Sequence, residues 1–142
     1  MTSLTFDHLG IIVADLDKAL ESYREIFGYE LLRGPYVDPK QQVRVCFLGS
    51  NGAGHPDLEL VAPISDQSPV TNMLNNGGGA YHVCYQVLNL EQALSDLRSK
   101  GCFIVSRPVP AVAFGGARIA WIYTPARQLM ELVERSSGKN EH

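Results

Sequence analysis

Apolar residues recur along this chain at two spacings, and each spacing predicts a kind of element. Residues 8–13 form an apolar run typical of a strand. Apolar residues at helical intervals then fill 15–28, which opens on Asp15, a good helix N-cap, and closes on Gly28, which suits a helix end. Short apolar runs predict further strands at 29–32, 43–48 and 58–63.

The same pattern is written a second time. His8 begins the run HLGIIVADLDKAL and His82 begins HVCYQVLNLEQAL, with matching residues at an offset of 74. The second copy predicts a helix over 90–100, with Asn89 as its N-cap, and strands over 102–106, 117–123 and 129–134. We therefore expect a duplicated strand–helix–three-strand unit.

The repeat sets the expected domain organisation. We expect one domain over residues 1–135, with a first module at about 5–63, a linker at 64–79 and a second module at about 80–135. Within the linker, residues 68–75 are a candidate short helix, and the glycines at 77–79 read as a flexible joint. We expect a flexible tail over 136–142.

Composition narrows the classes of function. The 142-residue chain has a formal net charge of −3 and no basic stripe, which argues against nucleic acid as a partner. No apolar run is long enough to span a membrane and the first residues lack a signal-peptide pattern, so we expect a cytoplasmic protein without a membrane partner. The three cysteines, Cys46, Cys84 and Cys102, are odd in number and far apart in the sequence, which favours reduced thiols over a disulfide framework.

Each copy carries one histidine in its first strand and one glutamate in its last. The separations are 51 residues for His8 and Glu59 and 49 residues for His82 and Glu131. Strand alternation puts each glutamate on the face opposite its flanking leucines or methionine, where a buried carboxylate needs a partner. A single strand histidine is most often structural, and His55 and His142 are interpreted that way. The recurrence of the pair instead favours a divalent metal site, formed if the two units meet about a pseudo-twofold axis.

The segments FDHLGIIVADLDKALESYREIFG, GGGAYHVCYQVLNLEQAL and LMELVE resemble the vicinal-oxygen-chelate, or glyoxalase/bleomycin-resistance/dioxygenase, superfamily. The chain is most similar to its methylmalonyl-CoA epimerase-like members. The resemblance implies an α+β fold, in which two tandem βαβββ modules form a cupped mixed sheet with helices outside. It also implies one divalent ion (Zn, Ni, Co or Mn) held by His8, Glu59, His82 and Glu131, and a homodimer.

The resemblance implies an enzyme, a metal-dependent isomerase or epimerase that moves a proton next to a thioester or keto carbonyl. Its substrate would be a small molecule, with an acyl thioester such as an acyl-CoA as the candidate. Glu131 is implied as the catalytic base, with Glu59 as a possible substitute. Two alternatives stay open: a lactoylglutathione lyase of the glyoxalase I type, and a metal-free small-molecule-binding or resistance protein on the same fold.

Other positions carry weaker expectations. Some bacterial epimerases have a second glutamate where this chain has Val45, and since valine cannot transfer a proton, this position argues against a two-base mechanism. Arg33, Arg44 and Arg118 are candidates for holding a carboxylate or phosphate, with a surface-charge role as the default. The apolar stretch 109–121 is a candidate flap over an acyl pocket, and its alternative is a core loop.

Overall fold

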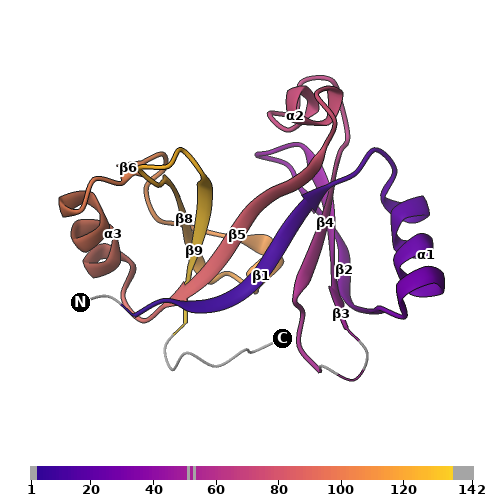
Figure 1. Ribbon diagram of the computed structural model, residues 1–142, viewed down its shortest axis with the longest axis horizontal. Coiled ribbons are helices and arrows are strands. Elements are labelled where there is room, and N and C mark those ends of the chain that lie inside the picture. The colour runs from indigo at the N-terminus through magenta and orange to yellow at the C-terminus, as the bar shows by residue number, and fades with distance from the viewer. Residues whose placement is uncertain (1–2, 51, 53, 136–142) are drawn as a thin grey trace. The chain divides into compact units, whose positions relative to one another are not determined.

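The computed structural model describes residues 3–50, 52 and 54–135, whose course is drawn in Figure 1. The chain forms two compact units. The N-terminal unit comprises residues 8–81, and the C-terminal unit comprises residues 82–135 together with residues 3–7. One boundary therefore falls just before His8 and the other just before His82, at the same point of the sequence repeat. The predicted tail at 136–142 lies outside the described residues.

The N-terminal unit is a mixed sheet with one long helix against it. Its elements are β1 (Thr5–Ile12), α1 (Leu16–Phe27), β2 (Glu30–Asp38), β3 (Val43–Gly49), β4 (Leu58–Pro63) and α2 (Thr71–Asn75). Strand β4 pairs in parallel with β1 and antiparallel with β3, and β3 pairs antiparallel with β2. The core lies between α1 and the sheet and includes Leu16, Leu48 and Leu60.

The C-terminal unit repeats this connectivity. Its elements are β5 (Gly79–Val87), α3 (Leu90–Ser99), β6 (Phe103–Ile104), β7 (Val109–Pro110), the 3₁₀ turn η1 (Val112–Phe114), β8 (Arg118–Tyr123) and β9 (Leu129–Glu134). Strand β9 pairs in parallel with β5 and antiparallel with β8, and β8 pairs antiparallel with β6 and β7. The predicted repeat and its mixed sheets with outer helices are confirmed, except that four strands follow the helix in the C-terminal unit, where the two-residue β7 also pairs with β8.

Both long helices begin where the sequence predicts. Asp15 accepts a hydrogen bond from the backbone N–H of Lys18, and Asn89 accepts one from that of Gln92. These side chains satisfy donors that a helix start leaves without an internal partner. Gly28 ends α1 in the left-handed conformation, φ 72°, which a glycine adopts without the clash that a Cβ would cause.

The largest differences from the predicted boundaries concern three elements. Strand β2 runs nine residues and passes through two register irregularities, whereas the pattern predicted only 29–32. Its counterpart predicted at 102–106 keeps only the two residues of β6. The linker helix shortens from 68–75 to Thr71–Asn75, because Ser68 instead bonds the backbone oxygen of Gln41.

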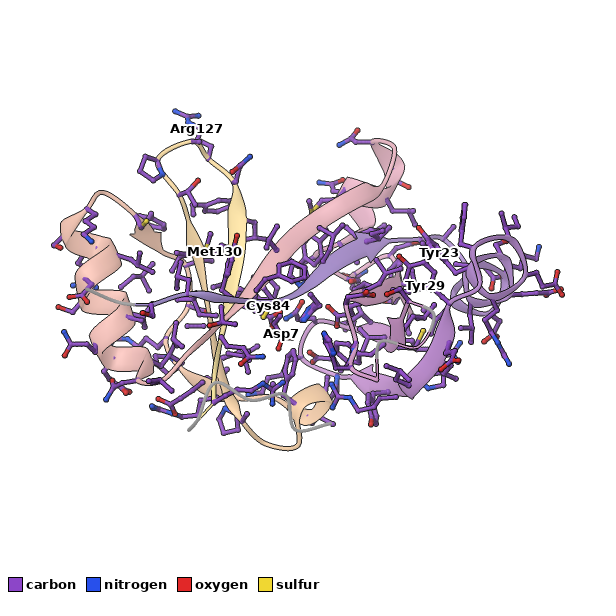
Figure 2. All side chains as sticks on the ribbon, turned by 60° about the horizontal axis from the view of Figure 1, so that its bottom comes forward. Asp7, Tyr23, Tyr29, Cys84, Arg127 and Met130 are labelled. Atoms are coloured by element: carbon purple, nitrogen blue, oxygen red, sulfur yellow. The ribbon has the colours of Figure 1, made fainter. Side chains whose placement is uncertain are left out.

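Aromatic contacts fix the end of α1 in the N-terminal unit. The rings of Tyr23 and Tyr29, labelled in Figure 2, meet edge to face with centroids 5.5 Å apart. Such a pair adds about 0.5–1.5 kcal/mol beyond the area it buries. None of the helices within the described residues is long and apolar enough to cross a membrane.

Candidate functional site

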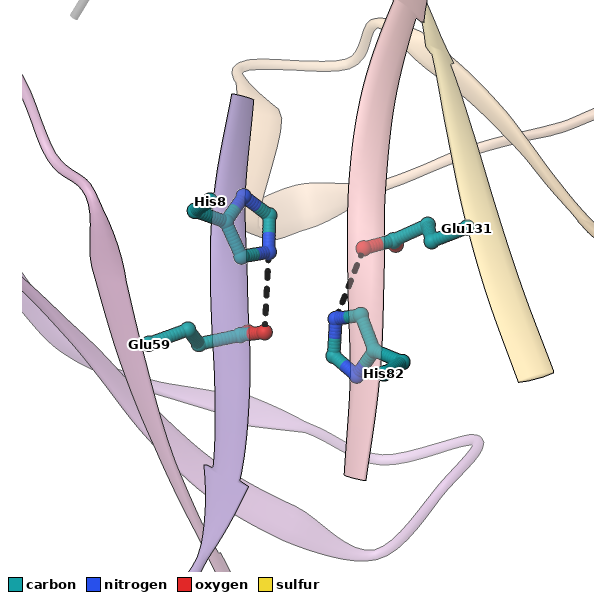
Figure 3. Close-up of side chains that lie close together, drawn as sticks. All are labelled: His8, Glu59, His82 and Glu131. Atoms are coloured by element: carbon teal, nitrogen blue, oxygen red, sulfur yellow. Dashed lines mark ion pairs between the residues drawn. The ribbon is translucent and has the colours of Figure 1, made fainter. Parts of the chain in front are cut away.

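The N-terminal unit buries one histidine–glutamate pair. His8 stands on β1 and Glu59 on the parallel neighbour β4, where Glu59 is in register with Gly10. The pair is therefore offset by two residues, so both side chains project from the same face of the sheet. His8 Nε2 lies 3.3 Å from Glu59 Oε1, with 0% and 9% of the two side chains exposed (Figure 3).

The C-terminal unit buries a second pair with the same register. His82 stands on β5 and Glu131 on the parallel neighbour β9, where Glu131 is in register with Cys84. The histidine again lies two residues before the partner of the glutamate. His82 Nε2 lies 3.1 Å from Glu131 Oε1, and both side chains are almost fully buried (Figure 3). The predicted pairing of each histidine with its glutamate is thus present in both units.

An aromatic ring accompanies each pair. Phe47 on β3 is directly opposite Glu59 and meets the His8 ring edge to face, with centroids 5.5 Å apart. Trp121 on β8 is directly opposite Glu131 and meets the His82 ring in the same way at 4.8 Å. Each ring therefore restricts the orientation of its imidazole. The sequence analysis missed these aromatics, although the offset of 74 residues relates them just as it relates the histidines.

The two pairs suit a divalent transition metal. A buried carboxylate is costly unless it is paired, hydrogen-bonded or coordinated. Imidazole nitrogen and carboxylate oxygen ligate zinc at ~2.0–2.2 Å, so two adjacent ligand atoms lie between about 2.8 Å apart in an octahedral site and about 3.6 Å apart in a tetrahedral one. The separations of 3.3 Å and 3.1 Å fall in this interval. Within each unit, the donors are thus spaced as two ligands of one ion would be.

A buried polar network in the C-terminal unit supports the residue before His8. Gln86 donates a hydrogen bond from Nε2 to Asp7 Oδ1 at 2.8 Å, and Arg135 Nε lies 3.7 Å from the same oxygen. Asp7 is labelled in Figure 2 and is 3% exposed. The network fixes the start of β1 against β5 and the end of β9, which holds the backbone just before the histidine in place. The sequence analysis did not single out these residues.

The arginine candidates receive different roles. Arg118 donates hydrogen bonds to both Glu91 and Glu134, so its guanidinium is a structural link rather than an open anion site. Arg44 forms an exposed ion pair with Asp17 at 3.7 Å, in line with the default surface role.

Arg33 belongs to the side of the sheet that carries His8. Its guanidinium carbon lies 4.5 Å above the ring of Phe47, the same ring that contacts the His8 imidazole. Arg33 is thus nearer to the candidate metal ligands than its sequence context indicated.

The structure also shows the surroundings of Val45, Phe114 and Cys46. Val45 alternates with Phe47 on β3 and is buried on the same face as Glu59, where it offers no group that titrates. Phe114 is buried beneath the guanidinium of Arg135, at 5.5 Å from its ring centroid, and the flap hypothesis stays a prediction. Burial raises the pKa of the Cys46 thiol to about 12, which makes it a poor nucleophile.

The fold and the paired donors define a class that comparison with known proteins identifies. Residues 7–121 match the model of the Glyoxalase/Bleomycin resistance protein/Dioxygenase superfamily. The chain belongs to this superfamily, as the sequence resemblance implied.

Within the superfamily, similar proteins include methylmalonyl-CoA epimerases. The mitochondrial epimerase of Bos taurus is 33% identical over 111 residues, which cover 77% of this chain and 61% of the relative. The solved epimerase of Mycobacterium tuberculosis is 30% identical, with a TM-score of 0.81 over 92% of this chain and 87% of that one. A variant of the Streptomyces coelicolor epimerase in complex with 2-nitronate-propionyl-CoA is also 30% identical, with a TM-score of 0.80 over 95% and 100% of the two chains. These relatives support the expectation of an enzyme.

Proposed function

We propose that the protein is a metal-dependent epimerase or related isomerase that moves a proton on the carbon next to the carbonyl of an acyl-CoA thioester. The observation that carries this proposal is the buried His–Glu pair that recurs at one register position in both units. The similarity to methylmalonyl-CoA epimerases supports the thioester substrate.

In this proposal, His8, Glu59, His82 and Glu131 together hold one divalent ion. Two neutral imidazoles and two carboxylates balance the charge of the ion and match the N/O preference of zinc, nickel, cobalt and manganese. A bound ion would supply Lewis-acid polarisation of the substrate carbonyl oxygen, which makes the proton on the adjacent carbon easier to remove.

Glu131 is the proposed base. One of its carboxylate oxygens would face His82, as Oε1 does at 3.1 Å, and the carboxylate would take the substrate proton and return it. Val45 supplies no second carboxylate on β3. In the proposed reaction one base therefore both removes the proton and returns it, and Glu59 is the substitute for Glu131 in this role.

Metal content tests the ligand set without any substrate. We expect about one divalent ion per chain in the purified protein, as a site of this donor set holds one. His82→Ala should lose most of it, whereas His55→Ala, which removes an exposed histidine from a loop, should retain it. Equal metal content in both variants, or none in the parent after addition of Zn, Ni, Co and Mn salts, contradicts the proposed ligands.

Proton exchange tests the reaction. The protein is incubated in deuterium oxide with methylmalonyl-CoA and ethylmalonyl-CoA, and loss of the α-proton is followed by NMR. Faster exchange with wild type than with Glu131→Gln supports the proposal. A protein that instead isomerises the hemithioacetal of methylglyoxal and glutathione, followed by ultraviolet absorbance, would be the lyase of the alternative reading. We also propose a homodimer, which light scattering checks as twice the chain mass of 15.6 kDa.

A further inference from the structure

A pocket of about 660 Å³ lies between α3 and the segment after β6, within the C-terminal unit. Its size falls in the range of small-molecule sites, roughly 300–1,000 Å³. One face of α3 forms one wall of the pocket, and residues 104–108 form the other wall. The polar or charged lining groups are Glu91, Ser95, Arg98, Ser106, Arg107 and Arg118.

This pocket is on the opposite side of the sheet from Glu131. Trp121 is in register with Glu131, so alternation places Arg118, three residues earlier, on the other face of β8. That other face also carries Ala120 and Ile122, which pack against Leu90 and Leu94 of α3. The pocket is thus separate from the proposed metal and acyl site.

The pocket has an excess of positive charge. Arg118 is more than neutralised, because the two carboxylates of Glu91 and Glu134 accept its hydrogen bonds at 2.7–3.1 Å and leave one negative charge over. The guanidinium groups of Arg98 and Arg107 form no ion pair and no hydrogen bond with any residue that the structure describes. Arg98 and Arg107 outweigh that surplus, so these five groups together carry a net charge of +1, in a chain whose net charge is −3.

The equivalent helix face in the N-terminal unit has the opposite charge. A hollow of about 500 Å³ on α1 is lined by Asp17, Leu20, Glu21, Arg24 and Glu25. At the offset of 74 residues, Asp17 corresponds to Glu91 and Arg24 to Arg98, but Glu21 is replaced by Ser95. The basic character of the pocket on α3 is consequently a property of this copy and not of the fold.

We propose that the pocket on α3 binds a phosphate group carried by a small molecule. Guanidinium groups donate paired hydrogen bonds to phosphate oxygens, and Arg98 and Arg107 would supply them from opposite walls. The oxygen of Ser106 already accepts the backbone N–H of Trp121 at 3.1 Å, which leaves its hydroxyl proton as a further donor. Leu94 and Ile104 provide apolar surface for the rest of the ligand.

Titration with inorganic phosphate, followed by amide NMR at constant ionic strength, tests the site. Saturable shifts should centre on residues 95–98 and 104–107. The double variant Arg98→Ala/Arg107→Ala should weaken binding at least tenfold, whereas Arg24→Ala/Arg127→Ala, which removes the same charge outside the pocket, should change it less than twofold. A parallel titration with coenzyme A identifies the source of the phosphate. Tighter binding of coenzyme A than of inorganic phosphate indicates a phosphate carried by a nucleotide, whereas equal binding of the two indicates free phosphate.

Two results would overturn the proposal. Shifts that rise linearly without saturation indicate only general ion effects. Equal weakening in the two double variants indicates a response to net charge rather than to this pocket. Because the pocket lies on the opposite face of the sheet from Glu131, metal content is measured in the same samples. Loss of phosphate binding with unchanged metal content separates this site from the proposed function.

Discussion

The two units share a backbone plan and the same buried chemistry, but they differ on their second strand and on their helix face. His8, Phe47 and Glu59 correspond to His82, Trp121 and Glu131, with edge-on ring contacts in both copies. The aromatic contact that positions each histidine–glutamate pair is thus present in both units. The residues away from that pair have changed charge, size and even secondary structure.

The second strand shows the largest change. In the N-terminal unit, Arg33 lies within the continuous strand β2 and above the Phe47 ring. Its counterpart at the offset of 74 residues is Arg107, which falls in the gap between β6 and β7 and lines the pocket on α3. Pro108 and Pro110 follow, and proline has no backbone N–H for a strand ladder. In the C-terminal unit this arginine therefore lies outside any strand and lines the pocket on the helix side of the sheet.

The largest expected effect is a difference in activity between variants of the two glutamates, Glu131 and Glu59. Glu131→Gln should lower kcat/KM for α-proton exchange about 10³-fold, because it removes the proposed base. Glu59→Gln should cost much less, since its amide oxygen still offers a ligand, and excess metal salt should restore the activity. Exchange rates of both variants are measured with and without added metal. Equal losses that metal does not restore would show that both units share the proton transfer.

The next comparison concerns the two cores. Leu60 and Leu132 are equivalent residues of β4 and β9, and neither side chain is exposed to solvent. Leu60→Ala and Leu132→Ala should each lower the free energy of unfolding by about 3 kcal/mol, through lost burial and the cavity left behind. Urea unfolding is followed by circular dichroism and by fluorescence of the single tryptophan, Trp121, in the C-terminal unit.

The two probes also reveal whether the units unfold together. Coincident transitions in both variants indicate one cooperative block. If Leu60→Ala shifts only the circular dichroism transition while the fluorescence transition stays in place, the units unfold separately.

The repeat made most of the fold and both donor pairs predictable. Helix caps and alternating strands are local signals, and the recurrence of His8 at His82 singled out residues that look ordinary one at a time. The length of β2 and the loss of its counterpart were not predictable in this way, because strand pairing depends on the neighbouring strand. The role of Arg118 was missed for a related reason, since its partners Glu91 and Glu134 lie on other elements.

Replacing the N-cap residue of each long helix should have a smaller effect on the free energy of unfolding. Asp15→Ala and Asn89→Ala each remove one hydrogen bond to a helix start, at a cost of about 1 kcal/mol. The charged cap of α1 also interacts with the helix dipole, so Asp15→Ala should cost slightly more at low salt. Urea unfolding at 20 mM and 500 mM NaCl measures this difference. An excess for Asp15→Ala that persists in high salt would have to come from something other than the dipole.

The smallest expected effect concerns the arginine that links helix to sheet in each unit. Arg44 and Arg118 correspond in the repeat, but Arg44 has one exposed ion pair at 3.7 Å whereas Arg118 makes hydrogen bonds to two carboxylates. Glu134 also accepts the backbone N–H of Leu90 at the start of α3, so Arg118 holds the helix to β9. Arg118→Met should therefore destabilise the protein more than Arg44→Met, and both less than the leucine variants.

The dependence on pH identifies the source of that difference. Hydrogen bonds from Arg118 lower the pKa of Glu91 to about 2, and they also lower the pKa of Glu134. A carboxyl with a depressed pKa stabilises the folded state above its ordinary pKa, near 4.5, and this stabilisation is lost as the pH falls towards the folded value. The gap in unfolding free energy between wild type and Arg118→Met should thus be full at pH 7 and shrink between pH 4.5 and 2. Arg44→Met should show little of this trend, and a gap for Arg118→Met that is independent of pH would mean that packing of the arginine stem, rather than its charge, ties α3 to the sheet.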